Sequence, residues 1–449
     1  MAARRVERSE ELGRSFVQPS HAERPTQPYD ISSTGEIGST DEPAFKPTHD
    51  PLPESPVNTK TNAAPRLASI DAYRGLVMVL LAFNGFGILD ASRNFPNSEG
   101  WQTAGWLFDH VAWRGCSLWD MIQPSFMFLV GVSIPWSLAS QKANGVTPAQ
   151  GWLRAVARSA LLIVLGIFLI SNNKPTTDFS FMNVLTQIGM GYLVVYAIAQ
   201  SPSPLAPFVA TGILLGYGML FAFWPVGTPE EAAMLGLPAD RQQLPGFAAH
   251  WNQHLNPAAS FDRWFLNFFP REAPFVFNRG GYQTLNFIPS IATMLLGLAA
   301  GQSIKETPGA FPVAIRLVLG GVVIALLGWM LDVFGICPMV KRIWTPSWTL
   351  WSGGLCLSIL GLFHFLTEAA QRRWLVWPLV IAGMNSIVLY VLYMLLRPWM
   401  AATWERHLGA KVFLVAGASL APILQACAVG LSFWLFVWWL ARQKVFIRL

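Results

Sequence analysis

The chain has 449 residues, of which 53% are hydrophobic and only 12% charged, and its formal net charge is +6. In soluble proteins about a quarter of the residues are charged, so this composition excludes an ordinary soluble enzyme. It also speaks against a nucleic-acid-binding protein, because excess Lys and Arg in so apolar a chain is typical of the loops beside a membrane. The composition predicts an all-α polytopic membrane protein.

Residues 1–66 differ from the rest of the chain. They are rich in Pro, Ser, Thr and Glu and contain no apolar run long enough for the hydrophobic region of a signal peptide. Such a segment cannot bury enough apolar surface to offset the entropy lost on folding. The sequence therefore predicts a disordered cytoplasmic tail over 1–66, followed by one transmembrane domain over 67–449.

Apolar runs after the tail are long enough to cross a hydrocarbon core of about 30 Å as helices. They predict ten spans: 68–89, 119–140, 152–171, 181–199, 205–225, 285–303, 311–332, 347–367, 375–396 and 412–441. Two connections are unusually long, 90–118 and 226–284. Over the short loops, Lys and Arg are slightly more frequent on the side of the tail, which predicts that both termini are cytoplasmic and both long connections face outward.

The first span carries polar residues that hydrocarbon does not tolerate without partners. Asp71 and Arg74 are three residues apart, so they share a helical face and can pair. Either this pair locks the helix end, or Arg74 helps to hold an anionic cofactor entering from the cytoplasm. Asn84 needs a helix or a substrate as partner, and the flanking Gly85 and Gly87 indicate a close backbone approach or a local break.

The stretch FDHVAWRGCSLWD, residues 108–120, concentrates polar chemistry in the first long connection. His110 can take a proton from an amine or a hydroxyl near neutral pH, or form an acyl intermediate itself. Asp109 and Asp120 are close enough in sequence to orient it or balance its charge. A lone loop histidine is more often an ordinary surface residue, so the residues alone leave both interpretations open.

The four cysteines show no spacing typical of zinc or iron–sulfur sites, and the sequence predicts no metal. Cys356 and Cys427 lie inside apolar runs and are expected to be small hydrophobic residues. Cys116 and Cys337 fall in loops, where a disulfide between them is an alternative without further support.

Five ordered motifs resemble the heparan-α-glucosaminide N-acetyltransferase family and its bacterial relatives over most of residues 66–400. They are RLASIDAYRGLVMVLLAFN, FDHVAWRGCSLWDMIQPSFMFLVGVSI, IPSIATMLLGLAAG, KRIWTPSW and GMNSIVLY. The resemblance implies an integral protein of a bacterial cytoplasmic membrane that takes acetyl from acetyl-CoA on the cytoplasmic side. The acceptor would be an amino sugar or glycan on the far side.

The resemblance also implies roles for individual residues. The motif HVAWRG aligns with the family's catalytic-histidine motif and implies that His110 is catalytic, while Asn84 and Asp120 align with its asparagine and acid. Arg114 stands where the family's motif has Asn, which leaves the acceptor open. Basic groups on the inner face would hold the phosphates of the donor: Arg74, Arg154, Arg158 and Lys305. The acceptor would meet polar and aromatic groups on the outer face: Trp113, Arg114, Trp119, Asn286, Lys341 and Trp344.

Two further functions fit the same residues. A transporter for an amino sugar would use the same outward vestibule, with Asp120 and Arg74 as gating or proton-coupled groups. A structural protein of the cell envelope would leave His110 without a chemical role. The expected partners are the lipid bilayer and a small-molecule or glycan acceptor, and the sequence leaves open whether the protein forms a homodimer.

Overall fold

The computed structural model describes residues 67–172, 174–201, 205–237, 243–409 and 411–447, so the predicted tail 1–66 lies outside the described residues. Throughout these ranges the secondary structure is helical, and the only β pairing is one isolated bridge. Eight of the described helices are long and apolar enough to cross a membrane, and a bent pair formed by α1 and α2 would make nine. The predicted all-α polytopic membrane fold is confirmed.

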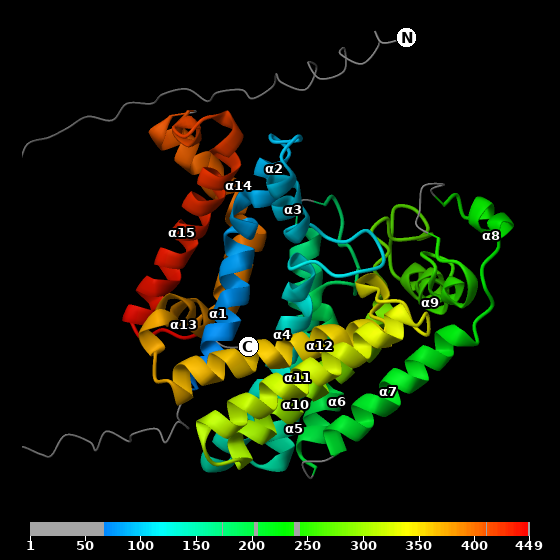
Figure 1. Cartoon of the computed structure of the whole chain (residues 1–449), viewed down its shortest axis with the longest axis horizontal. Coiled ribbons are helices and arrows are strands. Elements are labelled where there is room, and N and C mark those ends of the chain that lie inside the picture. Colours follow the sequence, from blue (N-terminus) through cyan, green and yellow to red (C-terminus); the bar gives the residue numbers. More distant parts are fainter. Residues whose placement is uncertain (1–66, 173, 202–204, 238–242, 410, 448–449) are drawn as a thin grey trace, which may run out of the picture. The chain divides into compact units, whose positions relative to one another are not determined.

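A helix lies at each of the ten predicted spans. These helices are α1 (Ala68–Ala82), α4 (Ile122–Ala143), α5 (Pro148–Ser171), α6 (Val184–Ala199), α7 (Leu205–Ala222), α10 (Phe287–Glu306), α11 (Ala310–Val333), α12 (Pro346–His364), α14 (Ser386–Leu408) and α15 (Ala421–Arg442). α6 has 16 residues, which is shorter than the eight spanning helices. The first and last of these helices lie near each other in Figure 1. Gly430 of α15 packs on Phe83 at the end of α1.

The ninth predicted span, 375–396, is wrong in its bounds. The helix α13 (Trp377–Met384) ends there, and α14 begins at Ser386 and continues to Leu408. Asn385 turns the chain because its side chain donates to Val445 O at 3.1 Å and accepts from Ile447 N at 3.1 Å. Asn385 thereby ties the C-terminal segment to the turn, and an apolar run in the sequence cannot reveal such a break.

Small residues let the helices approach closely, as is common between membrane helices. α4 packs on α10, where a Cβ added at Gly131 would lie 1.8 Å from Met294 O and one at Gly297 would lie 2.0 Å from Phe128 O. α1 packs on α13 in the same way, since a Cβ at Gly383 would lie 1.9 Å from Asp71 O. Asn385 and the C-terminal segment therefore lie beside the start of α1, at one end of the bundle.

The two long connections meet at the other end. The first contains η1 (Asn84–Gly87), α2 (Ile88–Ser92), α3 (Glu99–Leu107) and η2 (Trp119–Met121). The second contains α8 (Pro229–Met234), η3 (Gly246–Trp251), α9 (Pro257–Phe265), η4 (Leu266–Phe268) and η5 (Thr284–Asn286). Trp113 Nε1 donates to Trp251 O at 3.1 Å, and Arg114 forms a bridge with Val340, which precedes η6 (Lys341–Ile343).

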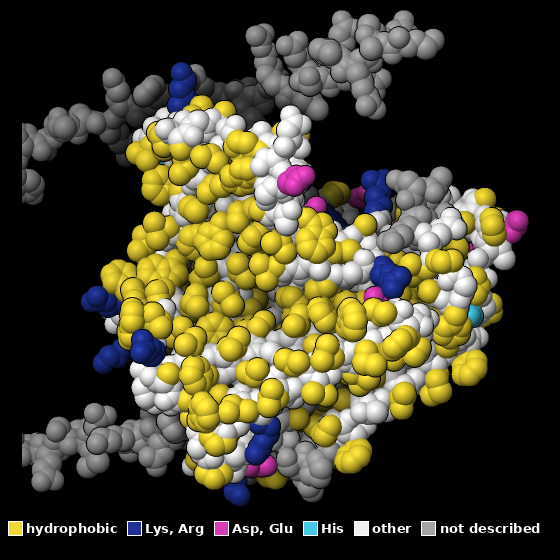
Figure 2. Space-filling view, viewed as in Figure 1, with side chains coloured by type: hydrophobic (Ala, Val, Ile, Leu, Met, Phe, Trp, Pro, Cys, Tyr) yellow, Lys and Arg dark blue, Asp and Glu magenta, His cyan; other side chains and the backbone are white. Residues whose placement is uncertain are grey.

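Large hydrophobic side chains are exposed along the outside of the helices, as expected for surfaces that face lipid. On α11 they include Leu319 at 59% and Val323 at 65% exposure. Figure 2 shows such side chains over most of the helical face, with Lys and Arg few and mostly toward its edges. This surface supports the statement that the chain is an integral membrane protein.

Candidate active site

The first span breaks where the sequence predicted a break. Asn84, Gly85, Phe86 and Gly87 all have φ between 49° and 69°, a left-handed turn that is tolerated best by Gly and Asn. A Cβ at Gly85 would lie 2.7 Å from the ring of Phe108, and one at Gly87 would lie 2.3 Å from Pro422 O. The two glycines therefore let the loop before His110 and the start of α15 close onto the end of α1.

Asn84 lies in this break, and its partner comes from a distant helix. The hydroxyl of Tyr393, on α14, donates to Asn84 Oδ1 at 3.1 Å. The amide oxygen of Asn84 therefore faces Tyr393, and the amide NH2 group points away from it. No hydrogen bond joins Asn84 to His110 among the described residues.

His110 and Asp120 form the centre of the site. His110 Nδ1 lies 2.7 Å from Asp120 Oδ1. The side chain of Asp120 is 2% exposed, whereas that of His110 is 41% exposed. The pair thus joins a buried carboxylate to a ring whose other nitrogen, Nε2, has no hydrogen-bond partner in the described part of the chain.

The loop is folded around the carboxylate of Asp120. Its Oδ2 accepts from Val111 N at 3.2 Å and from Ser117 N at 3.3 Å, and Asp120 N donates back to Ser117 Oγ at 3.2 Å. Ser117 Oγ also donates to Asp109 O at 2.6 Å. A Ser three residues before an acid is a sequence signal for a reciprocal cap, and it could have identified Ser117 as a residue that holds this loop.

Lys341 completes the cluster from far away in the sequence. Its Nζ lies 3.0 Å from Asp120 Oδ1 and 3.3 Å from His110 Nδ1, and the residue is 5% exposed. The turn that holds Lys341 is closed by Trp344 N donating to Lys341 O and by Val340 N donating to Thr345 Oγ1. Lys341 therefore contacts the candidate catalytic pair and is largely withdrawn from solvent.

Of the other residues expected at the acceptor, three are buried. Trp113 and Trp344 are 1% and 0% exposed, and the indole of Trp344 donates to Thr293 Oγ1 at 3.2 Å. Asn286 is 1% exposed, and its Nδ2 donates to Arg342 O at 2.9 Å. In this structure these side chains support the fold of the outer end and offer no open face to a sugar ring.

Arg114 and Trp119 lie nearer the surface. Arg114 Nε donates to Asp332 Oδ1 at 2.8 Å, which links the loop to the end of α11. Trp119 is half-buried, with its ring centroid 6.5 Å from that of Phe108. Both are close in sequence to His110. Among the residues predicted to bind the acceptor, Arg114 and Trp119 are therefore the ones that an acceptor could still reach.

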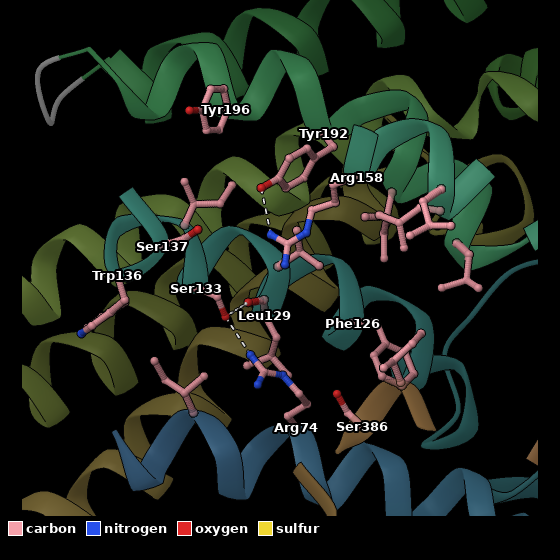
Figure 3. Close-up of a pocket in the computed structure, with 18 of the residues that line it drawn as sticks. Arg74, Phe126, Leu129, Ser133, Trp136, Ser137, Arg158, Tyr192, Tyr196 and Ser386 are labelled. Atoms are coloured by element: carbon pink, nitrogen blue, oxygen red, sulfur yellow. Dashed lines mark hydrogen bonds between the residues drawn. The ribbon is translucent and has the colours of Figure 1, made fainter. Parts of the chain in front are cut away.

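Three of the four basic residues predicted for the donor line one cavity of about 950 Å³ at the opposite end of the bundle. They are Arg74, Arg154 and Arg158. Arg158 Nη1 donates to Tyr192 at 3.0 Å, and Arg74 donates to Ser133 Oγ at 2.8 Å, as Figure 3 shows. The predicted pairing of Arg74 with Asp71 is confirmed at 3.2 Å.

Lys305 lies apart from these arginines. It lines a second cavity of about 410 Å³, which shares Leu67 and Trp136 with the larger one. Lys305 Nζ donates to Pro135 O at 3.2 Å. Of the four basic residues predicted from the sequence, the three arginines line one cavity and Lys305 lines an adjacent one.

The large cavity extends toward the His110 site along α4. Phe126 lines the cavity and lies six residues after Asp120, which is about 9 Å along a helix axis. The ring of Phe126 packs edge-on against Tyr390 of α14, with centroids 6.2 Å apart. Phe126 is thus the lining residue of the cavity that lies nearest to Asp120 along α4.

The loop cysteines do not compete with His110 as nucleophiles. Burial raises the pKa of Cys116 to about 12 and that of Cys337 to about 11, and the thiolate is the reactive form. All four cysteines are free thiols, so the alternative disulfide between Cys116 and Cys337 does not form here.

No protein-family model matches the chain. Two curated proteins are similar to it: heparan-α-glucosaminide N-acetyltransferase of Homo sapiens, 24% identical over 76% of this chain, and that of Mus musculus, 24% identical over 77%. The chain is distantly related to these acetyltransferases. It spans about half the length of the curated heparan-α-glucosaminide N-acetyltransferases it matches, 54% and 56%.

Proposed function

We propose that the protein is a membrane-embedded acetyltransferase. It takes acetyl from acetyl-CoA on the cytoplasmic side of a bacterial inner membrane and gives it to an amino sugar or glycan on the outer side. The observation that carries this proposal is the His110–Asp120 pair, a solvent-accessible imidazole held by a buried carboxylate at 2.7 Å. The distant relationship to N-acetyltransferases supports the class of reaction.

The chemistry assigned to this pair is base catalysis of acyl transfer. The acceptor nitrogen attacks the thioester carbonyl carbon, the new C–N bond forms, and the C–S bond breaks to release CoA as a thiolate. His110 Nε2 takes the proton that the nitrogen loses, and that proton neutralises the thiolate. The NH2 of Asn84 is the candidate donor to the carbonyl oxygen as negative charge develops on it. A route through an acetyl-His110 intermediate uses the same residues.

The donor is assigned to the large cavity. Acetyl-CoA carries phosphates, which Arg side chains bind well because the guanidinium is always charged and donates in a fixed fork. Arg74, Arg154 and Arg158 line the cavity together with Leu67 and Ile70 at the start of α1. The pantetheine arm would lie along α4 toward Phe126, and both termini would be cytoplasmic.

The decisive experiment follows transfer of labelled acetyl from acetyl-CoA to a panel of amino sugars by purified protein. We expect wild type to form acetylated product and His110→Ala to lose at least about a hundredfold in kcat, the usual contribution of a positioned general base. His407→Ala is the matched control, because His407 is exposed at the end of α14 and far in sequence from the site.

Three outcomes decide between the functions. Product from wild type and none from His110→Ala supports the enzyme. Undiminished product from His110→Ala would remove His110 from the mechanism. Binding of an amino sugar with no acetylated product and no affinity for CoA would favour the transporter.

A further inference from the structure

Lys341 stands out among the charged residues of the outer end because it is both buried and bound to the candidate catalytic pair. Its side chain is 6% exposed, and the Asp120 side chain that it meets is 2% exposed. A single oxygen, Asp120 Oδ1, receives His110 Nδ1 at 2.7 Å and Lys341 Nζ at 3.0 Å. The ammonium of Lys341 is therefore held by Asp120 and is largely withdrawn from solvent.

The contact between His110 and the Asp120 carboxylate fixes which ring nitrogen carries the proton. A lysine ammonium has three donors and no acceptor, and the carboxylate of Asp120 is an acceptor for both neighbours. Nδ1 must therefore be the N–H that donates to Asp120, and Nε2 of the neutral ring keeps its lone pair. That lone pair is what a base needs to take a proton from the acceptor.

Lys341 supplies positive charge next to the acids that surround the imidazole of His110. The loop contributes Asp109, whose Oδ1 accepts the backbone N–H of His110 at 2.7 Å, and η2 contributes Asp120. The turn at η6 contributes Lys341, and next to it Arg342 lies over the ring of Tyr282 at 5.5 Å. Without Lys341, the buried carboxylate of Asp120 would favour the protonated imidazolium, which has no lone pair to offer.

We propose that Lys341 is a positioning residue for His110. Its ammonium neutralises Asp120 and so keeps the ring neutral at Nε2, ready to take the proton of the acceptor. This inference rests on the proposed function of His110 as a base. It replaces the expectation from the sequence that Lys341 binds the acceptor.

The test compares Lys341→Met with Lys341→Arg and with the control Lys174→Met, whose lysine is an exposed partner of Asp178 on the loop after α5. In Lys341→Met, kcat falls by about tenfold or more while KM for the acceptor changes little. The acidic limb of its pH–rate profile moves up by about one pH unit, the size expected when a charge loses its neighbour of opposite sign. Lys341→Arg restores most of both properties.

A second readout does not depend on acetyl transfer. Diethyl pyrocarbonate modifies neutral imidazole, so the pH at which the His110 peptide reaches half its maximal modification rate reports the neutral fraction of the ring. We expect this midpoint to rise in Lys341→Met, to stay unchanged in Lys174→Met, and to fall back when Asp120→Asn is added to Lys341→Met. An unchanged melting temperature in detergent shows that each variant is folded.

The outcomes separate the two ideas. A raised acceptor KM with unchanged kcat and an unchanged modification midpoint in Lys341→Met would overturn the positioning role and return Lys341 to acceptor binding. A shifted midpoint in a protein whose wild type transfers no acetyl would keep the positioning role and remove the proposed function.

Discussion

Asp262, on α9, is an acid that the fold buries outside the membrane-spanning helices. It is 0% exposed, and its carboxylate accepts from Thr284 N at 3.0 Å. Burial raises its pKa to about 7, although the bonds from Thr284 and the charges of Arg271 and Arg263 oppose the shift. An acid whose pKa is higher in the folded than in the unfolded state stabilises the fold when protonated.

This pKa predicts how stability changes with pH. The contribution of Asp262 is complete below about pH 4, the usual pKa of an unfolded Asp, and is lost as the pH rises through about 7. We expect Asp262→Asn, which keeps an acceptor for Thr284 N, to flatten the fall in melting temperature between pH 5 and pH 8. Thermal unfolding in detergent measures it, with the exposed Glu272→Gln as control. An equally steep fall in Asp262→Asn would contradict the buried-acid account.

Single residues of the site were predictable where their chemistry is local. His110 and Asp120 are ten residues apart in one motif, so the sequence offered Asp120, along with Asp109, as a partner of His110. The break at Asn84 was indicated by its two flanking glycines. The contacts of Lys341 with Asp120 and of Tyr393 with Asn84 could not be predicted from the sequence. The partners lie 221 and 309 residues apart in the chain. Hydrophobic periodicity predicts local structure and does not reveal contacts between residues so far apart in the chain.

At the scale of helices, the contact between α4 and α10 positions the site. α4 begins just after Asp120, and the turn before α10 holds Asn286, which binds the residue after Lys341. Gly131 and Gly297 set the distance between these two helices. Any widening of this contact would move Asp120 away from Lys341.

This contact predicts a difference between two glycine substitutions. A Cβ at Gly131 would lie 1.8 Å from the carbonyl oxygen of Met294, so Gly131→Ala should destabilise the protein by about 1–3 kcal/mol, as overpacking usually does. Gly212→Ala on α7 meets nothing within 4 Å and should be neutral or stabilising by up to about 1 kcal/mol. Melting temperatures in detergent compare the two variants. Equal melting temperatures would mean that the helices are free to move apart.

Helix positions were predictable from apolar length, and helix ends were not. The run 375–396 is apolar throughout most of its length, yet the chain turns at Asn385 because the C-terminal segment supplies partners for its amide. The first span likewise ends in a left-handed turn, and the glycines at 85 and 87 were its only signal in the sequence. Hydrophobicity indicates which segments lie in lipid, whereas the position of a helix break depends on contacts with distant parts of the chain.

Across the whole transmembrane domain, the arginine-lined cavity and the His110 loop lie at opposite ends of the same helices. Ser137 of α4 lines the cavity, while Gly100 of α3 is exposed in the long connection that leads to His110. A donor on one side and an acceptor on the other require this separation. The slight excess of Lys and Arg in the short loops on the side of the tail predicts that the cavity faces the cytoplasm.

The separation predicts opposite accessibility of two engineered cysteines in sealed vesicles. A membrane-impermeant maleimide should label Ser137→Cys only from the cytoplasmic face and Gly100→Cys only from the outer face. Acetyl-CoA should slow labelling at Ser137→Cys, because its phosphates and arm would fill the cavity, and should leave Gly100→Cys unchanged. Wild type, with its four native cysteines, sets the background. Labelling of both positions from one face would refute the proposed transmembrane route, and acetyl-CoA protection at Gly100→Cys would move the donor site to the outer end.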